Sequence, residues 1–360
     1  MTPSKKRKQM ATHSDLIAAE AAHAGFINRV GRGNANKVIE YLKEADAYIA
    51  SRLAREGETI RNQSRLLAVQ KDIRSRLGAI YSKWEKARQD DLLEIIPYES
   101  DFQVRLLDKF TLDVDFRLPD DQQVLAAALR EPLLIGRGGS ALFTEKMLDQ
   151  WKPQQISMAN GAIQTGFSTG QTTQQISRQI RNEVLTLSRR DSDAIVITAT
   201  NHLSTVAKAK TYAENDDIVI GYRLIATLDT RTTNQCKAWD QTVILNDADY
   251  KPMPPFHYGC RTTTAPELSA EFAKFDKGAT RASNFDGGGK VSSTEQYYDG
   301  LARQSASIQN DALGRERAMI FRNAGLTPEE FKKASVDQLG RPLTIKGMAQ
   351  RDERIKDYLQ

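Results

Sequence analysis

Hydrophobic residues recur at helical spacing through the first part of the chain. Val38, Leu42, Ala45, Ile49 and Leu53 follow one another at steps of three and four residues. A second series has the same spacing: Leu66, Val69, Ile73, Leu77, Ile80 and Trp84. Such steps place the apolar side chains on one face of a helix. The pattern predicts two or three amphipathic helices between Ser14 and about Pro97.

Glycine and proline positions predict where these helices end. We expect Gly31 and Gly33 to separate the first helix from the second, and Gly57 to separate the second from the third. Pro97 should end the long third helix, because proline cannot continue a helical hydrogen-bond ladder.

A change of period follows, because Leu112, Val114, Phe116 and Leu118 alternate strictly with polar residues. Alternation is typical of a half-buried strand, here expected over residues 111 to 118. Glycines at 136, 138 and 139 then mark a loop. Helical spacing returns afterwards, and Thr172 with Gln175 predicts a capping box at the start of one helix.

The segment after Asp216 is rich in β-branched and aromatic residues, which predicts a strand or hairpin. Prolines 252, 254 and 255 force an extended loop, and residues 261 to 264 are expected to return as a second strand before Pro266. Apart from the strand at 111–118, we expect residues 14–215 to be almost wholly helical and the β structure to be confined to about 216–265. Residues 284–289 indicate a flexible connection, and Thr327 to Glu330 predict a capped helix in the tail.

The chain is therefore expected to be α+β and predominantly α-helical, with a helical N-terminal half, a small mixed α/β central domain containing a short antiparallel β element, and a helical C-terminal tail. Five regions are predicted: 1–13 as a basic disordered tail, 14–110 as a helical region, 111–140 as a strand and glycine-rich connection, 141–270 as the central domain, and 271–360 as a linker and helical tail.

Composition fits an ordinary protein with a hydrophobic core, because 40% of the 360 residues are hydrophobic and 27% are charged. Two cysteines cannot make a disulfide framework, which favours a reducing cytoplasm. The start of the chain lacks the apolar stretch of a signal peptide, and no run approaches the ~18 apolar residues of a membrane span. We expect neither classical export nor a membrane partner.

Lysines and arginines number 51 against 46 acids, giving a formal net charge of +5. This excess is too small to demonstrate nucleic-acid binding. Four of the cations are consecutive: Lys5, Lys6, Arg7 and Lys8. The block is either an arm that contacts a phosphate backbone or an acidic partner, or simply a solvated terminus.

Reactive residue types are densest between positions 229 and 261. The candidate residues are Asp229, Arg231, Thr232, Cys236, Asp240, His257, Cys260 and Arg261. A strand end, a polar turn and a proline-braced loop should bring His257 near both cysteines. The other histidines, at 13, 23 and 202, are expected to be ordinary surface or interface residues.

In order and spacing, these residues resemble the phage Mu F-like family of minor head, or head morphogenesis, proteins, with the head morphogenesis domain expected over 141–270. Members have an Asp-x-Arg-Thr at a strand end, paired cysteines, an Asp-Gly, and a proline-rich stretch leading to His-Pro-x-Cys-Arg-Cys. This chain departs at Thr233 and Thr262, where members often have cysteine, at Gln241 in place of glycine and at Tyr258 in place of proline. Residues 199–201 also replace a usual Arg-Thr-Glu.

The resemblance implies a structural minor capsid protein of a tailed bacteriophage or prophage, inside the virion head near the portal, present in the host cytoplasm during assembly. Implied partners are the portal protein, the major capsid or scaffolding protein, and packaged double-stranded DNA, with Lys5, Lys6, Arg7 and Lys8 as the candidate DNA contact. The eight motif residues would then form a structural turn. The protein itself would act in head assembly and in DNA packaging or ejection.

The same cluster leaves a rival class open, namely a metal-dependent nuclease or transferase that uses Cys236, His257 and Cys260. A structural zinc site needs four ligands, and this set requires Asp240 or a water as the fourth. A Cys-His pair can also form a thiolate nucleophile, but nothing else in the sequence supplies an orienting group or oxyanion donors. We therefore expect no enzyme activity, no cofactor and no metal requirement.

Overall fold

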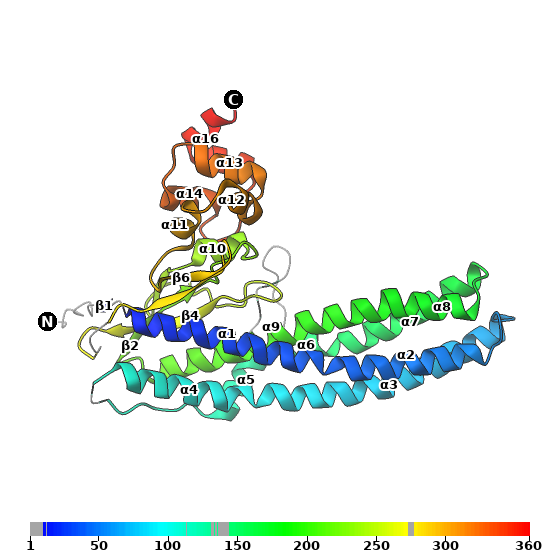
Figure 1. Cartoon of the computed structure of the whole chain (residues 1–360). Coiled ribbons are helices and arrows are strands. Elements are labelled where there is room, and N and C mark those ends of the chain that lie inside the picture. The colour runs from blue at the N-terminus through cyan, green and yellow to red at the C-terminus, as the bar shows by residue number, and fades with distance from the viewer. Residues whose placement is uncertain are drawn as a thin grey trace.

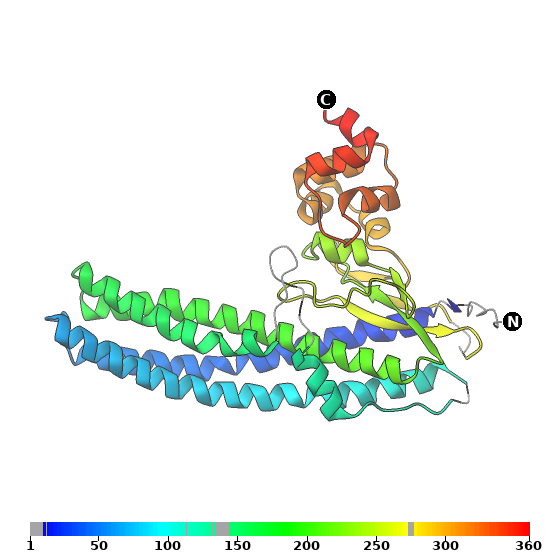
Figure 2. The same cartoon turned by 180° about the vertical axis from the view of Figure 1, so that it is seen from behind.

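A computed structural model describes residues 10–11, 13–112, 114–130, 133, 135, 144–272 and 277–360. It is 64% helical and 9% strand, which confirms a predominantly α-helical α+β fold. A long bundle of helices extends to one side, and a compact block with the sheet and the C-terminal helices stands on its other end (Figures 1 and 2). The basic block at residues 5–8 and the loop expected at 136–139 lie outside the described residues.

The bundle, called the arm below, is built from helices of two stretches of the chain that run side by side (Figure 1). The first stretch contains α1 (Ser14–Asn36), α2 (Val38–Ala54), α3 (Gln63–Leu93), α4 (Ile95–Phe110) and α5 (Asp121–Arg130). The second contains α6 (Thr144–Asp149), α7 (Trp151–Ser168), α8 (Thr173–Gln179), the π-helical turn η1 (Ile180–Leu185) and α9 (Thr186–Glu214).

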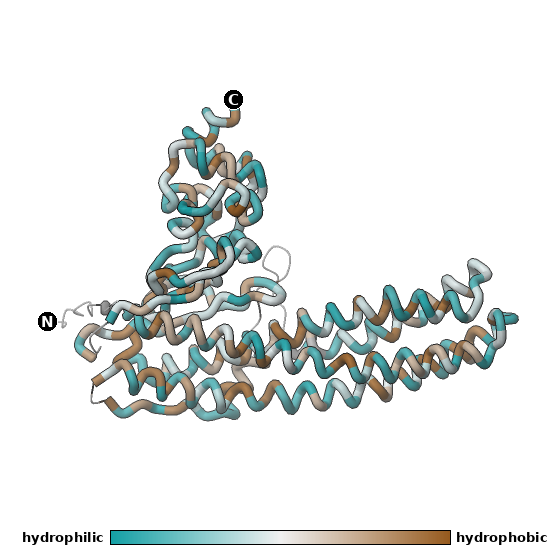
Figure 3. Tube along the Cα trace, viewed as in Figure 1, coloured by the Kyte–Doolittle hydropathy of each residue, from teal (hydrophilic) through white to brown (hydrophobic). Residues whose placement is uncertain are grey.

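The apolar stripes read from the sequence form the core of the arm. Every member of the two series is buried, and Trp84 and Trp151 pack against each other with ring centroids 4.3 Å apart. Hydrophobic and hydrophilic positions alternate along the arm helices (Figure 3). At the tip, the Thr173 hydroxyl donates a hydrogen bond to the Gly57 carbonyl at 2.6 Å. This bond ties the two stretches together in register.

Two of the predicted helix boundaries are wrong. Helix α1 continues through Gly31 and Gly33 to Asn36, because Gly31 packs closely against α9 at Ile197 and Thr200. Pro97 does not end α3, which stops at Leu93, but lies in the first turn of α4. Proline is tolerated there because first-turn amides have no helical acceptor. The predicted break at Gly57 is confirmed by its φ of +81°.

The strand predicted over 111–118 is wrong, because no strand forms in its described residues. This segment is extended but has no partner strand: the Asn215 side chain accepts a hydrogen bond from the Arg117 amide and donates one to the Arg117 carbonyl. Leu112 and Leu118 are exposed, whereas Val114 and Phe116 pack on the core of the block. The alternation of apolar and polar residues therefore indicates a half-buried extended segment and not a hydrogen-bonded strand.

The block contains a four-stranded antiparallel sheet in the order β1-β4-β2-β3 and a separate antiparallel hairpin of β5 and β6. The strands are β1 (Met10–Ala11), β2 (Val219–Ile225), β3 (Val243–Leu245), β4 (Thr263–Ser269), β5 (Thr280–Ser283) and β6 (Gly289–Ser292). The β structure thus extends well beyond residue 265, and the expected flexible connection at 284–289 is a hairpin turn. Strand β4 includes Pro266. On one side β4 pairs with β2, and on the other side β1 pairs only with Leu268 and Ser269, so Pro266 lies at an edge of the sheet, where proline is tolerated.

Seven short helices complete the block. They are α10 (Asn234–Trp239), α11 (Tyr297–Ala302), α12 (Ala306–Leu313), α13 (Arg315–Asn323), α14 (Pro328–Ser335), α15 (Ile345–Arg351) and α16 (Glu353–Tyr358). The capping boxes predicted at Thr172 and Thr327 are both formed. Contacts between the tail and α10 include the buried Lys237 ammonium, which donates to the Ala312 carbonyl, and Gly340, which packs against the Trp239 ring.

Helix α9 passes from the arm into the block and carries a buried lysine. The Lys208 ammonium lies 2.5 Å from Glu20 Oε2 of α1, 3.9 Å from Glu99 Oε1 of α4 and 2.8 Å from the Thr263 hydroxyl of β4. His23 also contacts Glu99, at 2.9 Å. Burial would raise the pKa of the Glu99 carboxyl, but the Lys208 charge and the His23 hydrogen bond outweigh burial and lower it.

His23 was expected at a surface or interface and is instead buried, as are His13 and His202. The sequence shows each of them isolated on its own segment, whereas the partners of His23 lie about eighty residues away on α4. In the part of the chain that the structure describes, no helix is long and apolar enough to cross a membrane.

Candidate functional site

The predicted cluster forms at the end of β2, where α10 faces the proline-rich loop. Thr233 begins α10, and its hydroxyl accepts a hydrogen bond from the Cys236 amide. This cap places the Cys236 side chain toward the loop that carries His257 and Cys260. The prediction that His257 lies near both cysteines is therefore confirmed.

The three side chains make one compact group. Cys236 Sγ lies 3.2 Å from His257 Nε2 and 3.7 Å from Cys260 Sγ, and the three potential ligand atoms all lie within 4.8 Å of one another. The other imidazole nitrogen, Nδ1, donates to the Tyr258 carbonyl at 2.9 Å, which turns Nε2 toward the sulfurs. Both cysteines are buried.

The surroundings of the two cysteines shift the pKa values of their thiols in opposite directions. Burial would raise the pKa of the Cys260 thiol, but hydrogen bonds from Cys236 and His257 hold that pKa well below its usual range. The hydrogen bond to Cys260, and then burial, raises the pKa of Cys236 well above its usual range. Burial opposes the charged form of His257, yet its contact with Cys260 raises the pKa of the imidazole. These contacts favour the charged form of Cys260 and disfavour that of Cys236.

The space beside this group is very small. A cavity of about 40 Å³ adjoins Cys236, His257, Thr233 and Thr262. A cavity of this size has room for an ion or for one to a few water molecules. It does not admit a substrate.

The group offers three of the four ligands of a structural zinc site. The fourth candidate, Asp240, does not face it. Both Asp240 oxygens receive hydrogen bonds from Arg281, and Oδ1 also accepts one from the Ala226 amide at 2.8 Å. The cysteine positions of relatives carry Thr233 and Thr262, and the Thr262 hydroxyl is buried without a hydrogen-bond partner. A metal held here would have an S₂N protein ligand set and would need a water or a threonine hydroxyl to complete it.

Asp229 and Arg261 form a second, neighbouring unit. Arg261 donates from both terminal nitrogens to the Asp229 carboxylate, at 2.5 and 2.8 Å. The Thr232 hydroxyl and the Arg231 amide donate to the same carboxylate. Burial would raise the pKa of the Asp229 carboxyl, but the hydrogen bonds and charge of Arg261 outweigh it and lower that pKa. The pair ties the end of β2 to the start of β4.

Arg231 does not have the role that its position suggests. Its side chain is 76% exposed, and the guanidinium lies 3.6 Å from Asp229, beyond hydrogen-bond distance. Only its backbone amide helps to hold the carboxylate. The phenol of Tyr297 occupies the buried side instead and donates to the Asp229 carbonyl at 2.7 Å.

Several departures from the family pattern have a visible structural counterpart. Gln241 has a φ of +61°, a left-handed conformation that favours glycine, the residue that the resemblance implies at this position. Asn201, at the position of a usual glutamate, donates to the Cys260 carbonyl at 2.7 Å. Thr198 accepts a hydrogen bond from the Gly259 amide at 3.0 Å. Helix α9 therefore still supports the loop, through neutral side chains.

Sequence reasoning missed Arg281 and Tyr297. Arg281 is buried and holds Asp240 from β5, 41 residues further along the chain. Neither residue lies near the cluster in sequence, and neither belongs to a recognisable spacing. The β5–β6 hairpin pairs with the chain just after β2, through Leu228 and Ser283. This pairing places Arg281 beside the cluster.

With this geometry established, comparison with known proteins becomes informative. Residues 158–265 match the family model described as phage Mu protein F like protein. This part of the chain is a phage Mu protein F like domain. All eight motif residues from Asp229 to Arg261 lie within the match, which supports a phage head morphogenesis protein. No curated protein and no solved structure matches the chain.

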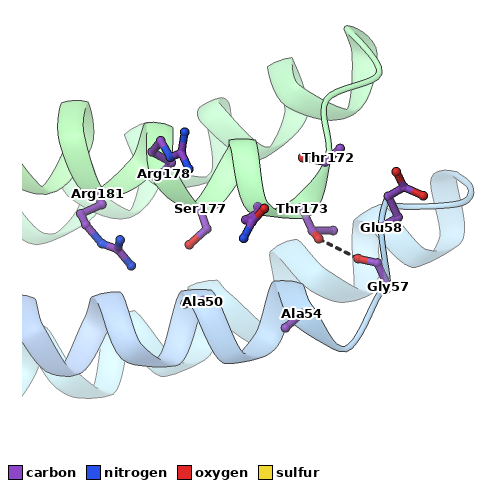
Figure 4. Close-up of a pocket in the computed structure, with 10 residues that line it drawn as sticks. Ala50, Ala54, Gly57, Glu58, Thr172, Thr173, Ser177, Arg178 and Arg181 are labelled. Carbon is purple, nitrogen blue, oxygen red and sulfur yellow. Dashed lines mark hydrogen bonds between the residues drawn. The ribbon is translucent and has the colours of Figure 1, made fainter.

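A larger hollow lies away from the motif. One cavity, of about 610 Å³, lies at the tip of the arm between α2 and α8 (Figure 4). Its walls include Glu58, Arg178 and Arg181, and Arg181 is already paired with Asp46. Its lining includes no cysteine or histidine, so it offers no acid–base or nucleophilic pair.

The two arginines beside Asp229 provide a matched test of the motif. Arg261→Ala should lower the free energy of unfolding by about 1–3 kcal/mol, because it leaves the buried Asp229 carboxylate without its main donors. Arg231→Ala should cost less than about 1 kcal/mol, because an exposed ion pair contributes little. Urea unfolding at pH 7 measures both.

The same experiment at acid pH tests the cause. Because Arg261 lowers the pKa of Asp229 in the folded protein, its stabilisation is complete above the ordinary pKa of about 3.9 and is lost as pH falls through the folded pKa. The difference between wild type and Arg261→Ala should shrink in that range. Equal losses for the two arginine variants at pH 7 would contradict the assignment.

Metal removal tests the Cys236, His257 and Cys260 group. Since the protein ligand set is incomplete, we expect EDTA or a stronger chelator to leave the melting temperature nearly unchanged. Thermal unfolding with and without chelator, together with metal analysis of the purified protein, measures this. Stoichiometric zinc in the untreated sample, with a drop of several degrees on its removal, would show that the group is a metal site after all.

Proposed function

We propose that the protein is a minor capsid protein of a tailed bacteriophage or prophage. It lies inside the head near the portal and acts in head assembly and in DNA packaging or delivery. The match of residues 158–265 supports the head morphogenesis role, and the family is typically structural. Its partners are the portal protein and the major capsid or scaffolding protein.

The observation that carries this proposal is the closure of the motif. The reactive side chains from Asp229 to Arg261 bond mainly to one another and to neighbouring backbone, and the cavity beside the cysteines and His257 measures about 40 Å³. An enzyme site of ordinary size occupies ~300–1,000 Å³ and receives its ligand there. The motif instead joins β2, α10, the proline-rich loop and β5. Such connections are typical of residues that stabilise a fold.

The arm supplies the contact surface that a structural role requires. Its longest helix, α3, has 31 residues and therefore spans about 46 Å. Leu67 on this helix is 57% exposed although it is a large apolar residue. We assign the arm to contact with the portal or coat, while the block keeps the arm in a fixed position.

The rival function is a metal-dependent nuclease or transferase at Cys236, His257 and Cys260. The contact between a cysteine and a histidine is the feature that favours it, because such a pair can form a nucleophile when it is accessible. Both sulfurs are buried, however, and Asp240 is held by Arg281 instead of joining the group. Nuclease activity that depends on added metal and is lost in Cys260→Ser would establish this rival.

Purification of procapsids tests the proposed location. The full chain should co-purify with the portal protein, and Leu67→Lys should reduce its amount about tenfold, corresponding to about 1.4 kcal/mol of contact energy. Leu118→Lys is the matched control, because Leu118 is also 57% exposed but lies outside the arm helices, between α4 and α5. Quantitative immunoblotting against portal protein measures all three.

Point substitutions are preferable to truncation here, because α1 contributes Leu16 and Ile17 to the core of the block. Absence of the wild-type chain from portal-containing particles would contradict the proposed location. Equal effects of Leu67→Lys and Leu118→Lys would contradict the role of the arm. Circular dichroism of both variants confirms that the exposed substitutions leave the fold intact.

A further inference from the structure

A second cavity of about 610 Å³ adjoins the motif. It lies between α1 and the strands that face it, β4 and β5, and we call it the α1 groove. Arg261 lines this groove as well as the small cavity beside the cysteines. The groove and the motif therefore share a residue that Asp229 holds in place. Figure 1 shows α1 running beneath the sheet and hairpin.

The α1 side of the groove is made of small residues. Ala18, Ala21, Ala22 and Gly25 recur there at steps of one, three and four, on the helix face toward the strands. Because these side chains are short, the groove stays open where α1 passes the hairpin. Its floor is smooth and apolar, which suits the backbone and small side chains of an extended chain.

The remaining walls carry positive charge. Four cations line the groove, namely Arg29, Arg261, Arg281 and Lys290, and no carboxylate belongs to its lining. Asp229 and Asp240 pair with Arg261 and Arg281. Arg29 and Lys290 are exposed and form no ion pair among the described residues. The groove thus has two cations without an ion-pair partner in the part of the chain that the structure describes.

Arg261 and Arg281 also keep unused donors. Arg261 gives one hydrogen from each terminal nitrogen to Asp229, so its Nε and its other terminal hydrogens have no partner among the described residues. The Nε of Arg281 is buried without a hydrogen-bond partner. A guanidinium that is oriented by one carboxylate is well placed to bind a second anion through its free edge.

From this arrangement we propose that the α1 groove binds an acidic, extended peptide segment of a partner protein in the phage head. The proposal rests on the structural function proposed above and names the chemistry of one contact. Acidic motifs are commonly recognised by clusters of arginine, and the groove volume lies within the ~300–1,000 Å³ of ordinary ligand sites. Carboxylates of the segment pair with Arg29, Arg261 and Lys290, while its small side chains lie on the alanine floor.

A peptide fits these features better than duplex DNA does. The phosphates of a duplex lie on a broad convex surface, which matches projecting cations on an open face. Here the cations line a hollow with an apolar floor between a helix and a hairpin. A narrow chain can enter such a hollow, whereas a duplex can touch only its rim.

Fluorescence anisotropy with the full chain tests the proposal. The probe is a fluorescein-labelled peptide of four Ala-Asp repeats, with a four-repeat Ala-Asn peptide as the uncharged control. Wild type should bind the acidic peptide, and Arg29→Glu with Lys290→Glu should weaken binding at least about tenfold, since two attractive charges become repulsive. Lys71→Glu with Lys83→Glu is the matched control, because it changes the net charge equally at exposed sites on the arm.

The control double variant should bind within about twofold of wild type, and added salt should weaken binding. Three results would overturn the proposal: no binding of the acidic peptide, equal losses in both double variants, or preferential binding of a labelled DNA duplex that the groove variant abolishes. Thermal unfolding verifies that each variant is folded. Because this assay uses the isolated chain, its failure is distinguishable from absence of the protein from portal-containing procapsids.

Discussion

One buried lysine connects the parts of this protein that lie far apart in sequence. Lys208 of α9 contacts Glu20 of α1, Glu99 of α4 and Thr263 of β4, and all three partners are buried. Two carboxylates in this position would be very costly without a cation, because burial disfavours their charge. Since α9 also supports the proline-rich loop through Thr198 and Asn201, the arm, the sheet and the motif all depend on the same helix.

Much of the fold was predictable because its signals are local. The two apolar series on α2 and α3 identify the arm core, and the capping boxes at Thr172 and Thr327 are complete within four residues. The grouping of Cys236, His257 and Cys260 was predictable for a similar reason, because one turn and one loop bring them together. The ordered motif also led to the family that residues 158–265 match.

What the sequence did not reveal depends on contacts between distant segments. Alternation at 112–118 resembles a strand, but a strand needs a neighbouring strand. The described residues of this segment are held instead by single contacts, from the Asn215 side chain and the Phe272 carbonyl. Sequence spacing does not decide which arginine holds Asp229: Arg231 lies two residues away but is exposed, whereas Arg261 has the better geometry from across the fold. The hairpin at 280–292, with its Arg281, was missed, and residues 284–289 were predicted as a flexible connection. The glycines at 287–289 are as typical of a flexible segment as of a tight turn.

The central claim is that the arm and the block form one body held by Lys208. Urea unfolding of Lys208→Met tests it most directly, with Lys43→Met as a matched control whose lysine pairs with Glu40 at the surface. We predict a loss of about 3–5 kcal/mol for Lys208→Met, since two buried carboxylates lose their cation. Lys43→Met should lose less than about 1 kcal/mol. If Lys208→Met unfolds like Lys43→Met, the buried lysine does not hold the two parts together and the account is wrong.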